Sequence, residues 1–126
     1  MVLLGIDYGR KRTGMAVYIH GIVLPSEPVS GGWESIIERI ERCSELYGDV
    51  SVVIGLPLSA LGKPTELSKE VEDLAVKIRE YGYTVELVNE ARSSGEAIRL
   101  MGKKDRNGHV DSVAACEILK RYLNVL

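Results

Sequence analysis

Three acidic residues stand where the sequence predicts the ends of secondary-structure elements. Asp7 ends a hydrophobic strand, Glu90 ends a later strand, and Asp111 opens the last helix. Each position also has an ordinary structural explanation. Asp7 with Gly9 suits a turn, Glu90 suits a solvated strand end or the first turn of a helix, and Asp111 suits the positive end of a helix dipole. Residue type alone therefore assigns no function to them.

The spacing around Asp111 indicates the direction of its side chain. Asp111 precedes Ala114, Ala115 and Ile118 by three, four and seven residues. These offsets place its carboxylate on the flank of the apolar stripe of a helix. The two alanines let that helix approach a sheet closely, and a carboxylate turned towards a sheet needs a partner.

The three carboxylates converge if the strands ending at Asp7 and Glu90 finish at the same edge of one sheet. Divalent cations would relieve their mutual repulsion, and hard oxygen ligands suit Mg²⁺ or Mn²⁺. Two such ions about 4 Å apart activate water and stabilise the leaving oxygen in phosphodiester hydrolysis. We therefore take Asp7, Glu90 and Asp111 as the candidate catalytic and metal-binding residues.

Basic residues flank two of these acids. Three of them follow Asp7 after two intervening residues, and a second basic cluster at 103–106 precedes Asp111. Runs of charge are usually solvated surface, but each of these can hold phosphates on one side of a scissile bond. The candidate nucleic-acid-binding residues are Arg10, Lys11, Arg12 and Lys104, with the segment 102–108 as a clamp on the substrate.

The composition excludes several classes of protein. The 126 residues carry 16 Lys+Arg and 18 Asp+Glu, a net charge of −2, with 45% hydrophobic and 27% charged residues. Disordered and collagen-like chains do not have this composition. No apolar run approaches the roughly 20 residues of a membrane span, and the N-terminus lacks the basic segment of a secretory signal. We expect one cytoplasmic domain over residues 1–126 that does not bind membranes.

Charge and cysteine content limit the possible partners further. With a net charge of −2, binding of nucleic acid must be concentrated in local basic patches. Cys43 and Cys116 lack the spacing of metal ligands and are too few for a disulfide scaffold. We expect both to be reduced thiols.

The elements that must position the acids follow from the hydrophobic pattern. Two β-rich runs at 2–6 and 13–19 precede a turn at His20-Gly21. A third run at 22–29 contains Pro25 and Pro28, which indicate an edge strand or its early end. The sequence therefore predicts an antiparallel meander of three strands.

Helices and strands alternate after this meander. The pattern predicts a helix opened by a capping box at Ser35 and Glu38, a buried strand at 50–54 and an amphipathic helix at 67–81, followed by a strand at 83–88 and helices at 93–102 and 111–123. This order predicts an α/β fold, with a five-stranded mixed sheet and helices on its faces.

Three blocks of the sequence resemble the YqgF/RuvX family. They are Gly5-Ile6-Asp7-Tyr8-Gly9-Arg10-Lys11-Arg12-Thr13-Gly14, Val53-Ile54-Gly55-Leu56-Pro57 and Asp111-x-x-Ala114-Ala115. G-x-D-x-G alone also occurs in sugar-kinase and actin-type ATPases, but its continuation and the order of the other blocks are specific. The resemblance covers nearly the whole chain and implies a ribonuclease-H-like fold. We expect the structural loops of these blocks to contain Gly5, Gly9, Gly14, Gly55 and Pro57.

The resemblance also implies an activity. Members of the family are similar to Holliday junction resolvases and are associated with maturing the 5′ end of precursor 16S rRNA in bacteria. It implies a metal-dependent endonuclease with structured RNA, and the ribosomal precursor particle, as partners. Branched DNA is the alternative substrate, which a homodimer would suit, although a monomer is equally open. By the same resemblance, Asp7 and Asp111 take the places of two active-site carboxylates.

One block departs from the family pattern. Where the family typically reads D-E-R-x-[ST]-[ST], this chain has Asn89-Glu90-Ala91-Arg92-Ser93-Ser94. The acid before Glu90 has become an amide, so Glu90 is the only anionic candidate in the block. Because neighbours on a strand point to opposite faces, we expect Glu90 to face the site and Asn89 to face away from it.

Two other classes of function remain open at this point. The altered block suits a non-catalytic binder of nucleic acid or of an assembling ribosome, which Mn²⁺-dependent cleavage of a structured RNA would distinguish from a nuclease. Asp7 and Gly9 also suit the phosphate loop of an ATP-handling protein. Such enzymes generally need two copies of the fold, and 126 residues supply one.

Overall fold

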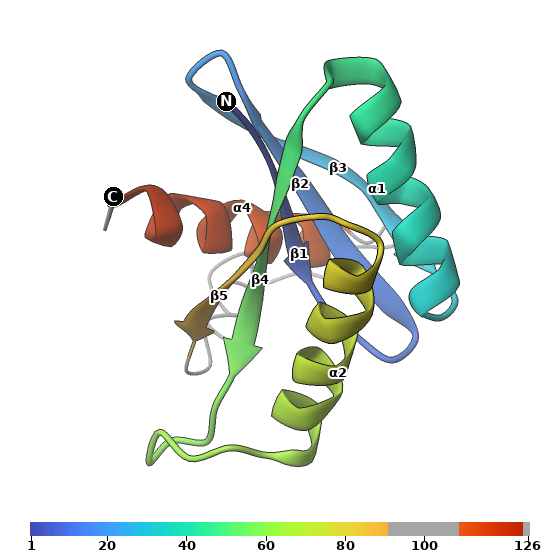
Figure 1. Ribbon diagram of the computed structural model, residues 1–126. Coiled ribbons are helices and arrows are strands. Elements are labelled where there is room, and N and C mark those ends of the chain that lie inside the picture. Colours follow the sequence, from blue (N-terminus) through green and yellow to red (C-terminus); the bar gives the residue numbers. More distant parts are fainter. Residues whose placement is uncertain (91–108, 125–126) are drawn as a thin grey trace.

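A five-stranded sheet in the order β3-β2-β1-β4-β5 forms the centre of the computed structural model, which describes residues 1–90 and 109–124 (Figure 1). The strands are β1 (Val2–Asp7), β2 (Arg12–Ile19), β3 (Ile22–Ser30), β4 (Val50–Pro57) and β5 (Val85–Glu90). The predicted five-stranded mixed sheet is confirmed. The helix expected at 93–102 and the segment 102–108 lie outside the described residues.

The first three strands form the predicted antiparallel meander. β1 pairs with β2, and β2 pairs with β3, in antiparallel register. The hairpin turn between β2 and β3 holds His20 at φ 54° and Gly21 at φ 78°, the left-handed pair that a tight two-residue turn requires. β3 lies at the edge of the sheet, the position in a sheet that tolerates proline.

β1, β4 and β5 run parallel to one another. β4 and β5 both continue further than the sequence predicts, because Leu56 pairs with Asn89 and Pro57 with Glu90 at the end of their ladder. Since the strands are parallel, their carboxyl ends meet at one edge of the sheet. The strands that end at Asp7 and Glu90 therefore finish at the same edge of one sheet, which is the condition stated above for the convergence of their carboxylates.

Three described helices pack on the sheet, namely α1 (Trp33–Tyr47), α2 (Glu66–Glu80) and α4 (His109–Asn124). The capping box expected at Ser35 and Glu38 is wrong. Gly31 at φ 104° and Gly32 turn the chain directly into α1, whose N-cap makes no side-chain hydrogen bond. α2 does have a capping box, between Thr65 and Ser68. None of the described helices is long and apolar enough to cross a membrane.

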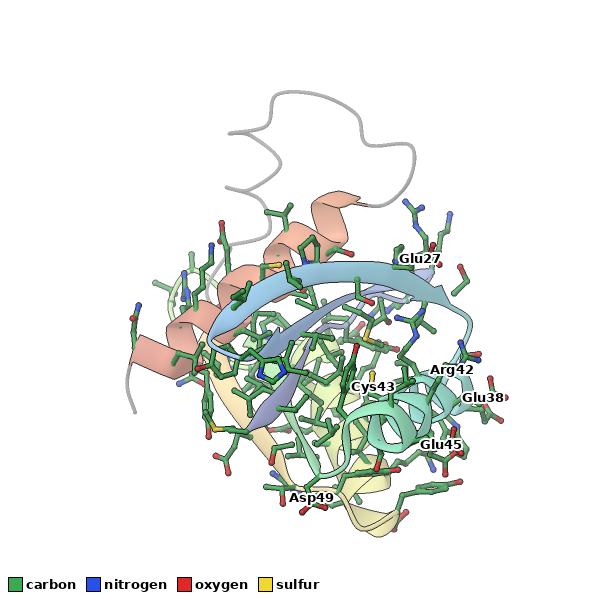
Figure 2. The ribbon with its side chains drawn as sticks, turned by 90° about the horizontal axis from the view of Figure 1, so that it is seen from above. Glu27, Glu38, Arg42, Cys43, Glu45 and Asp49 are labelled. Carbon is green, nitrogen blue, oxygen red and sulfur yellow. The ribbon has the colours of Figure 1, made fainter. Side chains whose placement is uncertain are left out.

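The sheet separates two hydrophobic clusters. Leu4, Ile6 and Ile54 pack under α1 and α2, whereas Leu3 and Val53 pack under α4. In Figure 2, α4 lies on one side of the sheet and α1 on the other, with Cys43 directed inward and Glu38 outward. Successive residues of β1 and β4 thus alternate between the two faces.

Glycines in the sheet let α4 lie close to the strands. A Cβ on Gly5 would stand 2.6 Å from Leu119 Cγ and 2.9 Å from the carbonyl oxygen of Ala115. Four of the five expected loop residues, Gly5, Gly14, Gly55 and Pro57, lie within strands instead, and only Gly9 lies in a loop. At Gly5 and Gly55 the reason is helix packing, which a side chain would obstruct.

Candidate active site

Asp7 and Glu90 end two parallel strands at the same edge of the sheet, with β4 between them. Leu3 belongs to the cluster under α4, and the backbone of Gly5 contacts that helix. Alternation along β1 therefore places Asp7 on the face that α4 covers.

Glu90 lies on the same face. Its side chain is 4% exposed, and its Oε2 is 3.2 Å from the point that a Cβ on Gly55 would occupy. The same point is 2.6 Å from Cδ1 of Ile118 in α4. Asn89 is exposed, so the orientation expected for Glu90 and Asn89 from strand alternation is confirmed.

Gly55 occupies the position between the two acids. Ile6 pairs with Ile54, so Gly55 is the next residue of β4 beside Asp7, while Glu90 Oε2 approaches it from the other side. Because Gly55 has no side chain, no protein atom projects from β4 between the two carboxylates. The space above Gly55 is taken instead by Ile118 of α4 and by the Glu90 carboxylate.

Asp111 lies in the first turn of α4, but its side chain is outside the described residues, as is Lys104. The start of α4 is fixed by Ser112, whose hydroxyl donates a 2.6 Å hydrogen bond to the carbonyl of Ser26. Ser26 pairs with Met15, and Met15 pairs with Ile6. The first turn of α4 is thus level with the end of β1. Convergence of the third acid stays a prediction.

Among the residues that the structure describes, no three His, Cys, Asp or Glu side chains form a metal-binding group. Asp7 and Glu90 supply two carboxylates, and the third candidate is Asp111. Carboxylate oxygens are the donors that Mg²⁺ and Mn²⁺ prefer. The donor chemistry of these carboxylates therefore fits a divalent ion.

The loop that follows Asp7 is closed on itself. Thr13, which is fully buried, donates from Oγ1 to the carbonyl of Gly9 at 3.3 Å and accepts from its N–H at 3.4 Å. A Cβ on Gly9 would collide with the carbonyl of Arg12. The loop therefore requires glycine at this position and holds its basic residues at a fixed place beside Asp7.

Arg10 is held against α2, although its side chain is 59% exposed. It forms an ion pair with Glu70 of α2, with Nη2 at 2.6 Å and Nε at 2.9 Å from Oε2, while the Tyr8 hydroxyl donates to Oε1 at 3.0 Å. The hydrogen bond from Arg10 holds the pKa of Glu70 below its ordinary value. Lys11 is exposed beside it, and Arg12 begins β2 opposite Ser30.

Glu70 and Thr13 were not identified from the sequence. Glu70 is 60 residues from Arg10 in the chain, and an acid on an amphipathic helix looks like any solvated residue. Thr13 carried a weak signal, because a polar residue between a basic run and a strand can close a turn.

The antiparallel meander, the parallel strands with acids at their carboxyl edge and the helix across one face define a ribonuclease-H-like α/β protein. The chain belongs to the RuvX family, whose family model, described as a Holliday junction resolvase, matches residues 1–125.

Relatives of similar length support this assignment. The chain is 34% identical over 129 residues to a Bordetella petrii protein, covering 98% of this chain and 95% of the relative. It is also 34% identical over 135 residues to an Oleidesulfovibrio alaskensis protein, covering 99% and 93%. Both proteins carry the name "Putative pre-16S rRNA nuclease".

A solved structure shares the fold. RuvC of Thermus thermophilus, in complex with a Holliday junction substrate, superposes with a TM-score of 0.57 at 15% identity, covering 99% of this chain and 96% of that chain. At this identity the likeness concerns the fold alone.

Proposed function

We propose that this protein is a cytoplasmic, metal-dependent endonuclease that hydrolyses phosphodiester bonds of structured RNA, with the 5′ end of precursor 16S rRNA as its substrate. The observation that carries the proposal is the position of Asp7 and Glu90 on one face of the sheet edge, on either side of Gly55. The relatives named for precursor 16S rRNA support the choice of substrate.

Asp7, Glu90 and Asp111 would hold Mg²⁺ or Mn²⁺. Bound there, the ions would activate a water molecule and stabilise the leaving oxygen. The burial of Glu90 suits this role, because a carboxylate that is 4% exposed keeps a fixed direction and faces little competition from solvent.

The basic residues would place the substrate. Lys11 and Arg12 stand between Asp7 and the part of β2 that pairs with β1 and would contact phosphates on one side of the scissile bond, with Lys104 on the other. Arg10 would exchange Glu70 for a phosphate when the substrate arrives, since its guanidinium is still partly exposed, with a side-chain exposure of 59%.

Branched DNA is the second candidate substrate, because the matching family is described as a Holliday junction resolvase. A direct comparison separates the two. Labelled precursor 16S rRNA fragments and a labelled four-way DNA junction are each incubated with the protein in Mn²⁺ and in EDTA.

We expect Mn²⁺-dependent cleavage of the RNA, absent in EDTA and in Asp7→Asn. Cleavage of the junction in preference to RNA would support resolvase activity instead. Binding of RNA without cleavage in any metal would identify a non-catalytic binder and overturn the proposal.

A further inference from the structure

A pocket of about 270 Å³ lies on the opposite face of the sheet from Asp7 and Glu90, at the end of β1. Its walls include two aromatic side chains, Tyr8 and Trp33, and three charged ones from α2, Glu70, Asp73 and Lys77. Tyr8 directly follows Asp7 and packs against the cluster under α1 and α2. The pocket is thus adjacent to the candidate active site but distinct from it.

Trp33 forms a fixed wall of this pocket. It is the first residue of α1, and α1 and α2 lie on the same side of the sheet (Figure 1). Lys77 Nζ stands 4.5 Å from the centroid of its ring, and the ring of Tyr81 is 6.5 Å away at an angle of 54°. Contacts with Lys77 of α2 and with Tyr81 just beyond the end of that helix therefore hold the indole in place.

The two acidic side chains of the pocket, Glu70 and Asp73, differ in their contacts. Both oxygens of Glu70 already accept hydrogen bonds, from Tyr8 and Arg10. Asp73 is an exposed residue of α2, four residues before Lys77 on the same side of that helix. Asp73 therefore presents acceptor oxygens beside an aromatic wall, an arrangement that suits a flat ring with N–H donors and disfavours a phosphate.

We propose that this pocket binds an unpaired nucleobase that carries an exocyclic amino group, on the strand whose backbone passes the loop at Arg10 and Lys11. The inference rests on the proposed function and names a specificity site for the same substrate. Unstacked bases bind to proteins by stacking on aromatic rings and by hydrogen bonds along their edges. Here Trp33 and Tyr8 supply the stacking surfaces, the base displacing Lys77 from the face of the indole that it covers, and Asp73 accepts from the amino group.

The position of the pocket suits a base close to the cleavage point. Tyr8 and Asp7 are consecutive residues whose side chains project to opposite faces of the sheet edge. A strand crossing that edge at the basic loop would bring a phosphate towards Asp7 on one face. A base about one or two nucleotides away would enter the pocket on the other face.

Trp33 is the single tryptophan of the chain, so its fluorescence reports on this pocket directly. The full-length protein is titrated in EDTA, which prevents cleavage, with short oligoribonucleotides of adenylate and, separately, of uridylate. We expect adenylate to quench Trp33 at a concentration about fivefold lower than uridylate, because uracil offers a carbonyl where adenine offers an amino group.

Two variants test whether Asp73 accepts a hydrogen bond from the base. In Asp73→Asn the amide can donate to the uracil carbonyl as well as accept, so the preference for adenylate should disappear while quenching remains. Glu72→Gln changes an exposed acid that does not line the pocket, and it should keep the preference.

Equal quenching by both oligonucleotides, or an unchanged preference in Asp73→Asn, would overturn the proposal. So would absence of quenching while a labelled oligonucleotide binds by anisotropy. These readouts do not depend on cleavage. RNA cleavage without a response of Trp33 would refute this site alone, whereas quenching without cleavage would refute the proposed nuclease and leave the site standing.

Discussion

Glu90 and Gly55 lie against each other at the carboxyl edge of the sheet, with Glu90 Oε2 3.2 Å from the position of an absent Cβ on Gly55. The same position is 2.6 Å from Ile118 Cδ1. The absence of a side chain at Gly55 therefore lets α4 approach the sheet closely. It also leaves space for the Glu90 carboxylate in its observed position.

Gly55→Ala should destabilise the protein by roughly 1–3 kcal/mol, because the added methyl group overpacks the contact with Ile118. It should also weaken Mn²⁺ binding roughly tenfold, since Glu90 must move. Urea unfolding and titration calorimetry measure the two effects. Gly5→Ala is the matched control, because its Cβ would press on Leu119 and Ala115 without touching Glu90. Equal Mn²⁺ affinity in both variants would contradict the assigned role of Gly55.

Asp7→Asn should reduce metal-dependent cleavage at least about a hundredfold while the protein stays folded, because metal catalysis supplies several kcal/mol of transition-state stabilisation. The measurement is single-turnover cleavage of labelled RNA, with circular dichroism as a check on folding. Asp49→Asn is the control, because Asp49 precedes the amino end of β4, at the opposite edge of the sheet, and is labelled in Figure 2. Full cleavage by purified Asp7→Asn would place the activity elsewhere.

The ion pair between Arg10 and Glu70 should make the stability of the protein depend on pH in the acid range. The hydrogen bond from Arg10 lowers the pKa of Glu70, so the contribution of this contact to stability is complete above the ordinary glutamate pKa. It is lost as pH falls through the lowered pKa of the folded protein. Arg10→Met should move the pKa of the Glu70 carboxyl, followed by NMR, up towards its ordinary value. Lys11→Met should leave it low, and an equal rise in both variants would show a general charge effect instead.

Cys43 and Cys116 should resist alkylation in the native protein. They belong to clusters on opposite faces of the sheet, so they do not pair, and burial raises the pKa of both thiols. Since the thiolate is the reactive form, iodoacetamide should modify them only as the protein unfolds. Rapid labelling of folded protein, followed by mass spectrometry, would show that one of the two clusters opens locally.

The sheet and the placement of Asp7 and Glu90 at the ends of its strands could be predicted because both depend on short-range patterns. Prolines indicated the edge strand, β-branched runs indicated the central strands, and the parallel connections bring strand ends to one edge. The alternation that turns Glu90 inward and Asn89 outward follows from the same local geometry.

Contacts made across long separations could not be predicted. Glu70 meets Arg10 only because α2 packs beside the end of β1, and nothing in the local pattern of α2 marks it. The start of α1 was also missed, because the turn at Gly31 and the packing of Trp33 decided it rather than a capping side chain. Gly5 and Gly55 were expected in loops but lie within strands, because α4 packs closely against both.

Asn89 and Ala91 differ from the pattern that the family typically shows in this block. For Asn89 the structure defines what a substitution by aspartate should do. Leu87 packs against the cluster under α1 and α2, and Val88 against the cluster under α4. Alternation groups Asn89 with Leu87 and Glu90 with Val88. Asn89 is exposed and lines a pocket with Arg121 and Tyr122 at the outer edge of β5.

Asn89→Asp should therefore leave Mn²⁺ affinity and cleavage rate unchanged, because the new carboxylate points away from Asp7. Glu90→Gln should weaken Mn²⁺ binding by at least about tenfold, because it neutralises the buried carboxylate beside Gly55. Calorimetry on both variants, with cleavage measured in parallel, gives the comparison. If Asn89→Asp instead raised Mn²⁺ affinity several-fold while Glu90→Gln had no effect, the metal-binding role would belong to position 89 and the assignment of Glu90 would be wrong.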